Sequence, residues 1–192
     1  MLPAVLAFAS GTLLLAGNSD KADEAPGPEP SADLEIPLPA LTRKQWLGFL
    51  KAAICGKPNT IGPNYRLGTF GLSVRRLCDL GVMEDPQVLV FGNQQVWDAK
   101  WLNPKNLQDF QRRPMVQYDL FARSVKDYAE NDQLRANVDR NIDGQVITLS
   151  GVLMLAQRAG LAGMERWIGS PKVRERFKDN TTAFVKRANG IF

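Results

Sequence analysis

The chain has 192 residues, with 24 Lys and Arg against 20 Asp and Glu, two Cys and no His. This length suits one compact domain plus an appendage, and the apolar and charged fractions of 44% and 23% are those of globular proteins. The absence of His excludes Ser-His-Asp and Cys-His catalysis, two Cys argue against a dedicated zinc site, and the sequence contains no GxxxxGK[ST] phosphate-binding loop. We therefore expect neither a metal nor a cofactor.

Charge is divided unevenly along the chain. Residues 1–40 hold one Lys and six acidic residues, a net charge of −5, whereas residues 41–192 hold 23 basic and 14 acidic residues, a net charge of +9. A basic body favours polyanions such as nucleic acid, anionic lipid or acidic wall polymers. The basic residues form no long run and are seldom interleaved with aromatic residues. We therefore favour a solvated basic surface and do not expect nucleic acid as a partner.

Residues 1–17 carry no charged side chain. As a helix this segment would be about 25 Å long, short of a hydrocarbon core of about 30 Å. Pro3, Gly11 and the lack of basic residues before the apolar run also depart from an ordinary signal peptide. Three interpretations stay open: a buried apolar tail, a membrane-inserting segment and an uncleaved export signal.

Residues 18–40 contain five Pro and six acidic residues. Such a composition favours extended, polyproline-like conformations and cannot bury enough apolar surface to fold alone. We expect an acidic linker that forms an extended N-terminal arm together with residues 1–17. Partners outside the chain would hold this arm in place.

Helical periodicity begins at Leu41. Thr42 and Gln45 form a capping-box pattern that predicts a helix. Its inward-facing residues are Trp46, Phe49, Leu50 and Ala53. A Gly/Asn/Pro loop over 56–71 follows, and the segment from Ser73 to Leu80 predicts a second helix that ends at Gly81.

The rest of the chain continues this mainly helical pattern. The predicted elements are first a short strand over 87–91, a short helix capped by Asn106 and a long helix from Pro114 to about Ala136. A hairpin around Asp143-Gly144 follows. An apolar helix then starts at Thr148, is broken at Gly160 and Gly163, and is followed by a second helix through Trp167 and a last helix from about Thr181 to Gly190. Residues 41–192 are thus expected to form one mainly α domain.

Three stretches of this domain carry motifs that occur together in one family. Residues 41–83 contain Asn64-Tyr65, the loop Leu67 to Gly71 and the helix end Leu77 to Gly81. The second stretch combines Asn106 to Phe110 with Pro114 to Gln117, and the third runs from Ile147 to Gly163, followed by the ending Asn180 to Phe192. In this order and spacing they resemble the lysozyme-like muramidase domains of tailed-phage particles and, more distantly, lytic transglycosylases.

This resemblance implies a lysozyme-like helical domain with a groove for a glycan strand, in which one carboxylic acid protonates the glycosidic oxygen. In the family the acid is a Glu at the end of the first domain helix. Cys55 lies at about that position here, and no carboxylate occurs between Glu35 and Asp79. A thiol transfers a proton poorly to an ether oxygen and cannot stabilise an oxocarbenium ion as a carboxylate does. We therefore assign no catalytic residue.

The resemblance also implies which residues bind substrate. These residues are Asn64, Tyr65, Gly68, Phe70, Gln157, Arg158 and Gly160. Gln157 or Arg158 stands where the family has a polar His, so a second site position is altered. Both changes indicate that the scaffold has been kept and the catalyst lost.

We accordingly expect a phage virion protein, part of a tail or ejection apparatus, whose lysozyme-like domain is inactive and either engages peptidoglycan or is structural. Other virion proteins would hold residues 1–40. Two alternatives stay open. One is an active peptidoglycan muramidase or transglycosylase that uses Asp79 or Glu84 as its acid. The other is a membrane-tethered envelope protein of the bacterial periplasm or inner membrane, anchored by residues 1–17.

Two residue pairs have more than one interpretation. Cys55 and Cys78 are predicted to be two buried apolar thiols, or alternatively a disulfide in an exported particle. Trp97 and Trp101, four positions apart, are predicted to pack in the core, or alternatively to form a platform on which sugar rings stack.

Overall fold

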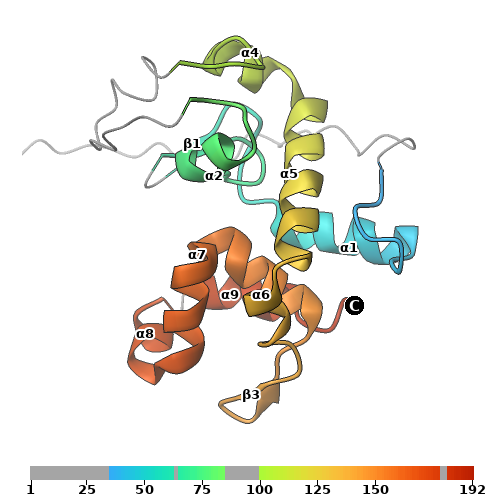
Figure 1. Cartoon of the computed structure of the whole chain (residues 1–192), viewed down its shortest axis with the longest axis vertical. Helices are drawn as coiled ribbons and strands as arrows, with labels where there is room; N and C mark the ends of the chain where they lie inside the picture. The colour runs from blue at the N-terminus through green and yellow to red at the C-terminus, as the bar shows by residue number, and fades with distance from the viewer. Residues whose placement is uncertain (1–34, 63–64, 85–99, 178–180) are drawn as a thin grey trace, which may run out of the picture.

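The computed structural model describes residues 35–62, 65–84, 100–177 and 181–192. These residues form helices and two short antiparallel hairpins (Figure 1). The expectation of a mainly α protein is confirmed. The predicted strand over 87–91, Trp97 and the N-terminal segments 1–17 and 18–34 lie outside the described residues.

The first helix, α1 (Arg43–Ala53), forms where the sequence predicts it. The Thr42 side chain accepts the Gln45 N–H, and the Gln45 side chain accepts the Thr42 N–H at 2.9 Å, which completes the capping box. The predicted inward residues are buried. After α1 the chain forms β1 (Ile61–Gly62), which pairs with β2 (Arg66–Leu67) inside the segment predicted as a loop. Helix α2 (Val74–Asp79) follows, capped by Ser73.

The middle of the chain departs from the prediction in one place. Asn106 caps α4 (Leu107–Arg112) as expected, and Pro114 opens α5 (Pro114–Ala129). The prediction that this helix runs to Ala136 is wrong. Its end is followed by Asn131, whose side chain accepts the Leu134 N–H and thereby caps a separate helix, α6 (Asp132–Arg135).

The C-terminal part contains the second hairpin and three helices. Strands β3 (Asn141–Ile142) and β4 (Gln145–Val146) flank Asp143-Gly144, whose φ angles of 52° and 82° suit the predicted tight turn. Helix α7 (Leu149–Gly169) bends at Gly160, where φ is 69° and ψ is 171°, whereas the second predicted break, at Gly163, is helical. Helix α8 (Pro171–Arg176) was not predicted, and α9 (Ala183–Ala188) is the last helix.

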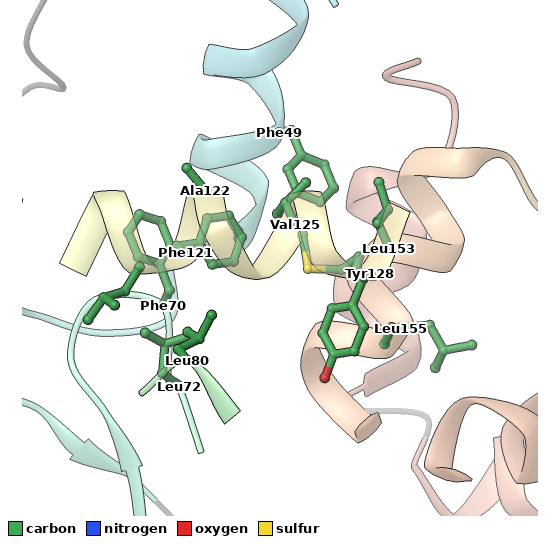
Figure 2. Packing of buried hydrophobic residues seen from close by; sticks show 14 of the residues in the cluster. Phe49, Phe70, Leu72, Leu80, Phe121, Ala122, Val125, Tyr128, Leu153 and Leu155 are labelled. Atoms are coloured by element: carbon green, nitrogen blue, oxygen red, sulfur yellow. The ribbon is translucent and has the colours of Figure 1, made fainter. Parts of the chain in front are cut away.

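Helix α5 lies at the centre of the fold. One end of it lies near α4, and the other end lies near α6 and α7 (Figure 1). The Phe121 ring stacks on Phe70 of the β2–α2 loop, with ring centroids 4.2 Å apart, and faces Phe49 of α1 at 6.1 Å. Figure 2 shows Phe121 and Val125 of α5 beside the rings of Phe70 and Phe49, and Leu153 of α7 on the side of Val125 that faces away from Phe121. One apolar core therefore joins α1, the loop after β2 and α7.

The end of the chain is fastened to the start of α7. Asn189 Oδ1 accepts the Thr148 N–H at 2.7 Å, and Asn189 Nδ2 donates to the Val146 carbonyl at 2.9 Å. Ser150 Oγ donates to the Ala188 carbonyl at 2.6 Å. A Cβ on Gly151 would lie 2.4 Å from Asn189 Oδ1, so this close approach requires glycine. Two of the segments that carry the resemblance are thus held together by structural contacts.

Trp101 is 9% exposed, and its ring lies 5.7 Å from that of Phe110. Its packing agrees with the core interpretation for this member of the Trp pair.

Within the part of the chain that the structure describes, no helix has both the length and the apolar character that a membrane crossing requires.

Candidate functional site

The end of α1 meets the loop after β2. The backbone N–H groups of Cys55 and Gly56 both donate to the Thr69 carbonyl, at 2.9 and 3.2 Å, and Cys55 Sγ lies 3.5 Å from the same oxygen. A Cβ on Gly71 would lie 2.8 Å from Cys55 Sγ and 3.2 Å from Arg158 Nη1. The predicted acid position thus lies against the loop and against Arg158 of α7.

Arg66 connects this loop to the bend in α7. Its Nη1 donates to the carbonyl oxygens of Gly71 at 2.9 Å and Gln157 at 3.4 Å, and its Nη2 donates to the Arg158 carbonyl. Because α7 bends at Gly160, the carbonyl groups just before the bend lack their regular helical partners. A cation at such a helix end satisfies these carbonyls and opposes the negative end of the helix dipole.

The charge around Cys55 is positive. Burial lowers the pKa of the Arg66 guanidinium, the charge of Arg158 lowers it further, and Cys55 and Tyr128 oppose both effects. Cys55 lies against the Thr69 carbonyl and Gly71 and near the guanidinium groups of Arg66 and Arg158. None of these four groups is a carboxylic acid, the kind of proton donor that glycoside cleavage uses.

Asp79 and Glu84, the alternative acids, lie in surface ion pairs. The Asp79 side chain is 42% exposed, and its Oδ1 lies 3.2 Å from Arg75 Nε. Glu84 pairs with Lys100, and its side chain is 51% exposed. A general acid that works near neutral pH needs a desolvated, partly apolar pocket that keeps it protonated. Neither carboxylate has such surroundings.

Gln157 is engaged by a polar network between α5 and α7. Its Nε2 lies 2.9 Å from Ser124 Oγ, which also accepts a hydrogen bond from Arg76 Nε at 2.6 Å. The guanidinium of Arg76 also donates to Asp127 Oδ2 at 2.9 Å and lies 4.4 Å from the centre of the Tyr128 ring. Burial raises the pKa of the Tyr128 hydroxyl, and the charge of Arg76 opposes this shift. Gln157 therefore joins two helices here, and a role for it in binding substrate stays a prediction.

Gly68 and Phe70 are turned towards the interior. Phe70 is 4% exposed, between the rings of Phe121 and Tyr118, with centroid distances of 4.2 and 4.9 Å. Gly68 has a φ of 74°, and a Cβ there would lie 2.4 Å from Gln117 Oε1. In this structure both residues shape the loop rather than face solvent.

Gln117 holds this loop in place, although it was not predicted as a site residue. Its side chain is fully buried; Oε1 accepts the Thr69 N–H at 2.9 Å, and Nε2 donates to the carbonyls of Pro58 and Phe110 at 2.9 and 3.0 Å. The second stretch of the resemblance therefore holds the first in position.

The remaining predicted residues differ in how they are placed. Tyr65 is half-buried with a φ of 52°, Gly160 forms the bend of α7, and Asn64 lies outside the described residues.

Arg66 was missed as a site residue. Its signal was a basic residue in a loop whose only other charged residue is Lys57, and the contacts that give it a role lie 91 and 92 positions away.

The two cysteines differ from the favoured expectation. Cys55 is exposed and Cys78 half-buried, so the prediction of two buried thiols is wrong, and the two do not form a disulfide with each other in this structure. Cys55 lies beyond the end of α1 at Ala53, and therefore outside the buried face of that helix.

A hollow of about 290 Å³ lies at a different place, between α6 and the second part of α7. Gln133, Asn137, Arg140, Glu165 and Ile168 line it. None of the predicted site residues contributes to its lining.

Comparison with known proteins gives no relative: no family model, no curated protein and no solved structure matches this chain.

Proposed function

We propose that this protein carries a lysozyme-like domain that has lost its catalytic acid, and that it engages peptidoglycan without cleaving it as a component of a phage tail or ejection apparatus. The observation that carries the proposal is the meeting of the three resembling stretches at one place. Cys55 at the end of α1 contacts Thr69, Arg66 contacts the bend of α7, and Gln117 of α5 holds the loop between them.

The chemistry at this place supports an inactive site. Cleavage of a glycosidic bond requires a protonated acid on one side of the scissile oxygen, and inverting or retaining enzymes use a second carboxylate as well. The described neighbours of Cys55 supply guanidinium groups instead. Guanidinium groups stay protonated at any physiological pH and cannot act as general acids. They do attract the acidic groups of a bacterial wall.

The N-terminal part of the sequence supports a place in an assembly. Residues 18–40, with five Pro and six acidic residues, have the composition of a linker that cannot bury enough apolar surface to fold alone, so partners would have to hold it. In the proposal, other virion proteins bind residues 1–40 and present the basic domain to the wall. Mass spectrometry of particles released by the cells that encode this chain tests its place in a virion, and absence of the chain from purified particles overturns it.

The test of the wall activity uses the purified full chain and intact peptidoglycan sacculi. We expect the chain to sediment with sacculi and to release no muropeptides, whereas an active lysozyme assayed in parallel releases them. Failure to sediment overturns engagement of the wall. Release of muropeptides overturns the inactive site, and loss of that release in Asp79→Asn or Glu84→Gln would identify the acid.

A further inference from the structure

The hollow between α6 and the second part of α7 brings two opposite charges to one place. Arg140, which follows α6, and Glu165 of α7 both line it. Among the residues that the structure describes, neither of these side chains forms an ion pair, either with the other or with a third residue. The hollow therefore offers one group for an anion and one group for a cation.

Hydrogen bonds hold both charged groups in position. Arg140 Nη1 donates to Asn137 Oδ1 at 2.7 Å, and Asn137, which is 7% exposed, donates through Nδ2 to the Gln133 carbonyl at 2.8 Å. The side-chain amide of Gln133 donates to Glu165 Oε1. Gln133 and Asn137 thus link the two charges in one chain of contacts, and preorganisation of this kind lowers the entropic cost of binding.

Both charged groups keep hydrogen-bonding capacity for a ligand. A guanidinium has five N–H donors, of which Arg140 uses one in its contact with Asn137. The others can pair with the two oxygens of a carboxylate. A carboxylate accepts several hydrogen bonds, so Glu165 can receive an ammonium group in addition to the Gln133 amide.

The rest of the lining and the size of the hollow limit what can bind. Ala136, Ile168 and Gly169 add apolar surface, and Ile168 is 6% exposed. The volume of about 290 Å³ lies at the lower end of the range for ligand pockets, about 300–1,000 Å³. These features suit a small ligand that is apolar in its middle and carries a charge of opposite sign at each end.

We propose that this hollow binds a short peptide with both ends free, its carboxylate on Arg140 and its ammonium group on Glu165. The apolar side chains of the peptide would lie against Ala136 and Ile168. A ligand with one charge would satisfy only one of the two charged groups. The hollow shares no lining residue with the surroundings of Cys55, so this site and the proposed function can fail separately.

The test titrates the nitrogen-15-labelled full chain with the dipeptide alanylalanine and follows the backbone amides by NMR. Two blocked dipeptides are titrated in parallel: the N-acetylated form lacks the ammonium group, and the C-terminal amide lacks the carboxylate. We expect alanylalanine to shift the amides of Asn137 and Ile168. Each block should weaken binding roughly fivefold, the range of one partly exposed ion pair.

Two variants assign the two ends of the peptide. Arg140→Gln should weaken binding of alanylalanine roughly fivefold and remove the effect of amidating the carboxylate, and Glu165→Gln should do the same for acetylation of the ammonium group. Arg166→Gln is the matched control, because Arg166 is exposed, neighbours Glu165 in sequence and does not line the hollow. We expect it to bind alanylalanine as the unchanged chain does.

Each other outcome overturns a defined statement. Absence of saturable shifts with alanylalanine overturns the site. Blocked dipeptides that bind as tightly as alanylalanine overturn recognition of the two charged ends. Equal effects of Arg140→Gln and Arg166→Gln show general charge attraction and overturn the role of Arg140. Shifts confined to residues outside α6 and α7 overturn the hollow as the place of binding.

Discussion

The guanidinium of Arg66 lies 3.4 Å from the carbonyl oxygen of Gln157, which is 91 positions further along the chain. With its contacts to Gly71 and Arg158, it fastens the β2–α2 loop to the bend of α7. We expect Arg66→Met to lower the free energy of unfolding by about 2 kcal/mol, because hydrogen bonds from a charged group are lost and carbonyls are left without donors. Urea denaturation followed by circular dichroism measures this change.

The matched control for Arg66→Met is Arg75→Met. The Arg75 side chain is 60% exposed and forms a surface pair with Asp79. Such pairs contribute about 0–1 kcal/mol, so the control is expected to change stability little. Equal losses in the two variants would contradict a structural role for Arg66.

Gln117 gives a second test of how the loop is held. Replacement by Leu keeps the approximate volume but leaves the Pro58 carbonyl and the Thr69 N–H without their partner, whereas the Phe110 carbonyl keeps the Arg113 N–H. We expect a loss of about 2–4 kcal/mol in unfolding free energy, because each buried unsatisfied group is costly. Gln111→Leu, which removes one exposed contact to Asn59, is the control and is expected to cost less than 1 kcal/mol, roughly the net value of one hydrogen bond. A Gln117→Leu variant as stable as its control would contradict the assignment.

Local signals explain which elements could be predicted from the sequence. The capping box at Thr42, the Asp143-Gly144 turn and the start of α5 at Pro114 depend on residues a few positions apart. The end of α5 was misplaced because the apolar spacing continues past Ala129, and only the capping contact of Asn131 shows that a new helix begins. Helix α8 carried a usable signal, since Ser170 precedes a Pro at the first helical position.

The site could be predicted only in part, because its contacts are long-range. The sequence places Cys55 after the first helix and shows that no carboxylate is near it in the chain. It does not show that Arg66 reaches the bend of α7, or that Arg158 and Arg187 share the ring of Phe184. These contacts depend on how α7 and α9 pack against the loop, which residue spacing alone does not determine.

Gly151 and Asn189 are expected to be coupled. A Cβ at position 151 would lie 2.4 Å from Asn189 Oδ1 and 2.9 Å from Ile147 Cγ1, so Gly151→Ala forces the two segments apart. We expect a loss of about 1–3 kcal/mol, typical of overpacking. Asn189→Ala removes the hydrogen bonds to Thr148 and Val146 and is expected to cost a similar amount.

The double variant separates coupling from independent damage. With Asn189 truncated, the closest obstacle to the new methyl group is gone, so the double variant should lose less than the two single losses added together. Chemical denaturation of all four proteins gives the coupling free energy. Simple additivity would contradict the contact between these two residues.

The Asp143 carboxylate provides a test by pH. A hydrogen bond from Arg174, at 2.7 Å, holds the pKa of Asp143 below its ordinary value near 3.8. Because the folded pKa is the lower one, the stabilisation is present above the unfolded value and is lost as the pH falls through the folded pKa. We expect a carbon-13 titration of the Asp143 carboxyl to show this depressed pKa. Asp143→Asn should make stability less sensitive to acid below about pH 4, the range in which an unperturbed Asp titrates; an ordinary pKa for Asp143 would contradict the contact.

Restoring an acid at position 55 tests the inactive site most directly. In a Cys55→Glu variant the new carboxylate would lie beside Arg66 and Arg158, and nearby positive charges favour the ionised form of a carboxyl group. A general acid must carry its proton, so we expect this variant to release no muropeptides from sacculi although the residue type of the active family is present. Release of muropeptides by Cys55→Glu would show that the acid alone was missing and that the nearby guanidinium groups of Arg66 and Arg158 do not prevent catalysis.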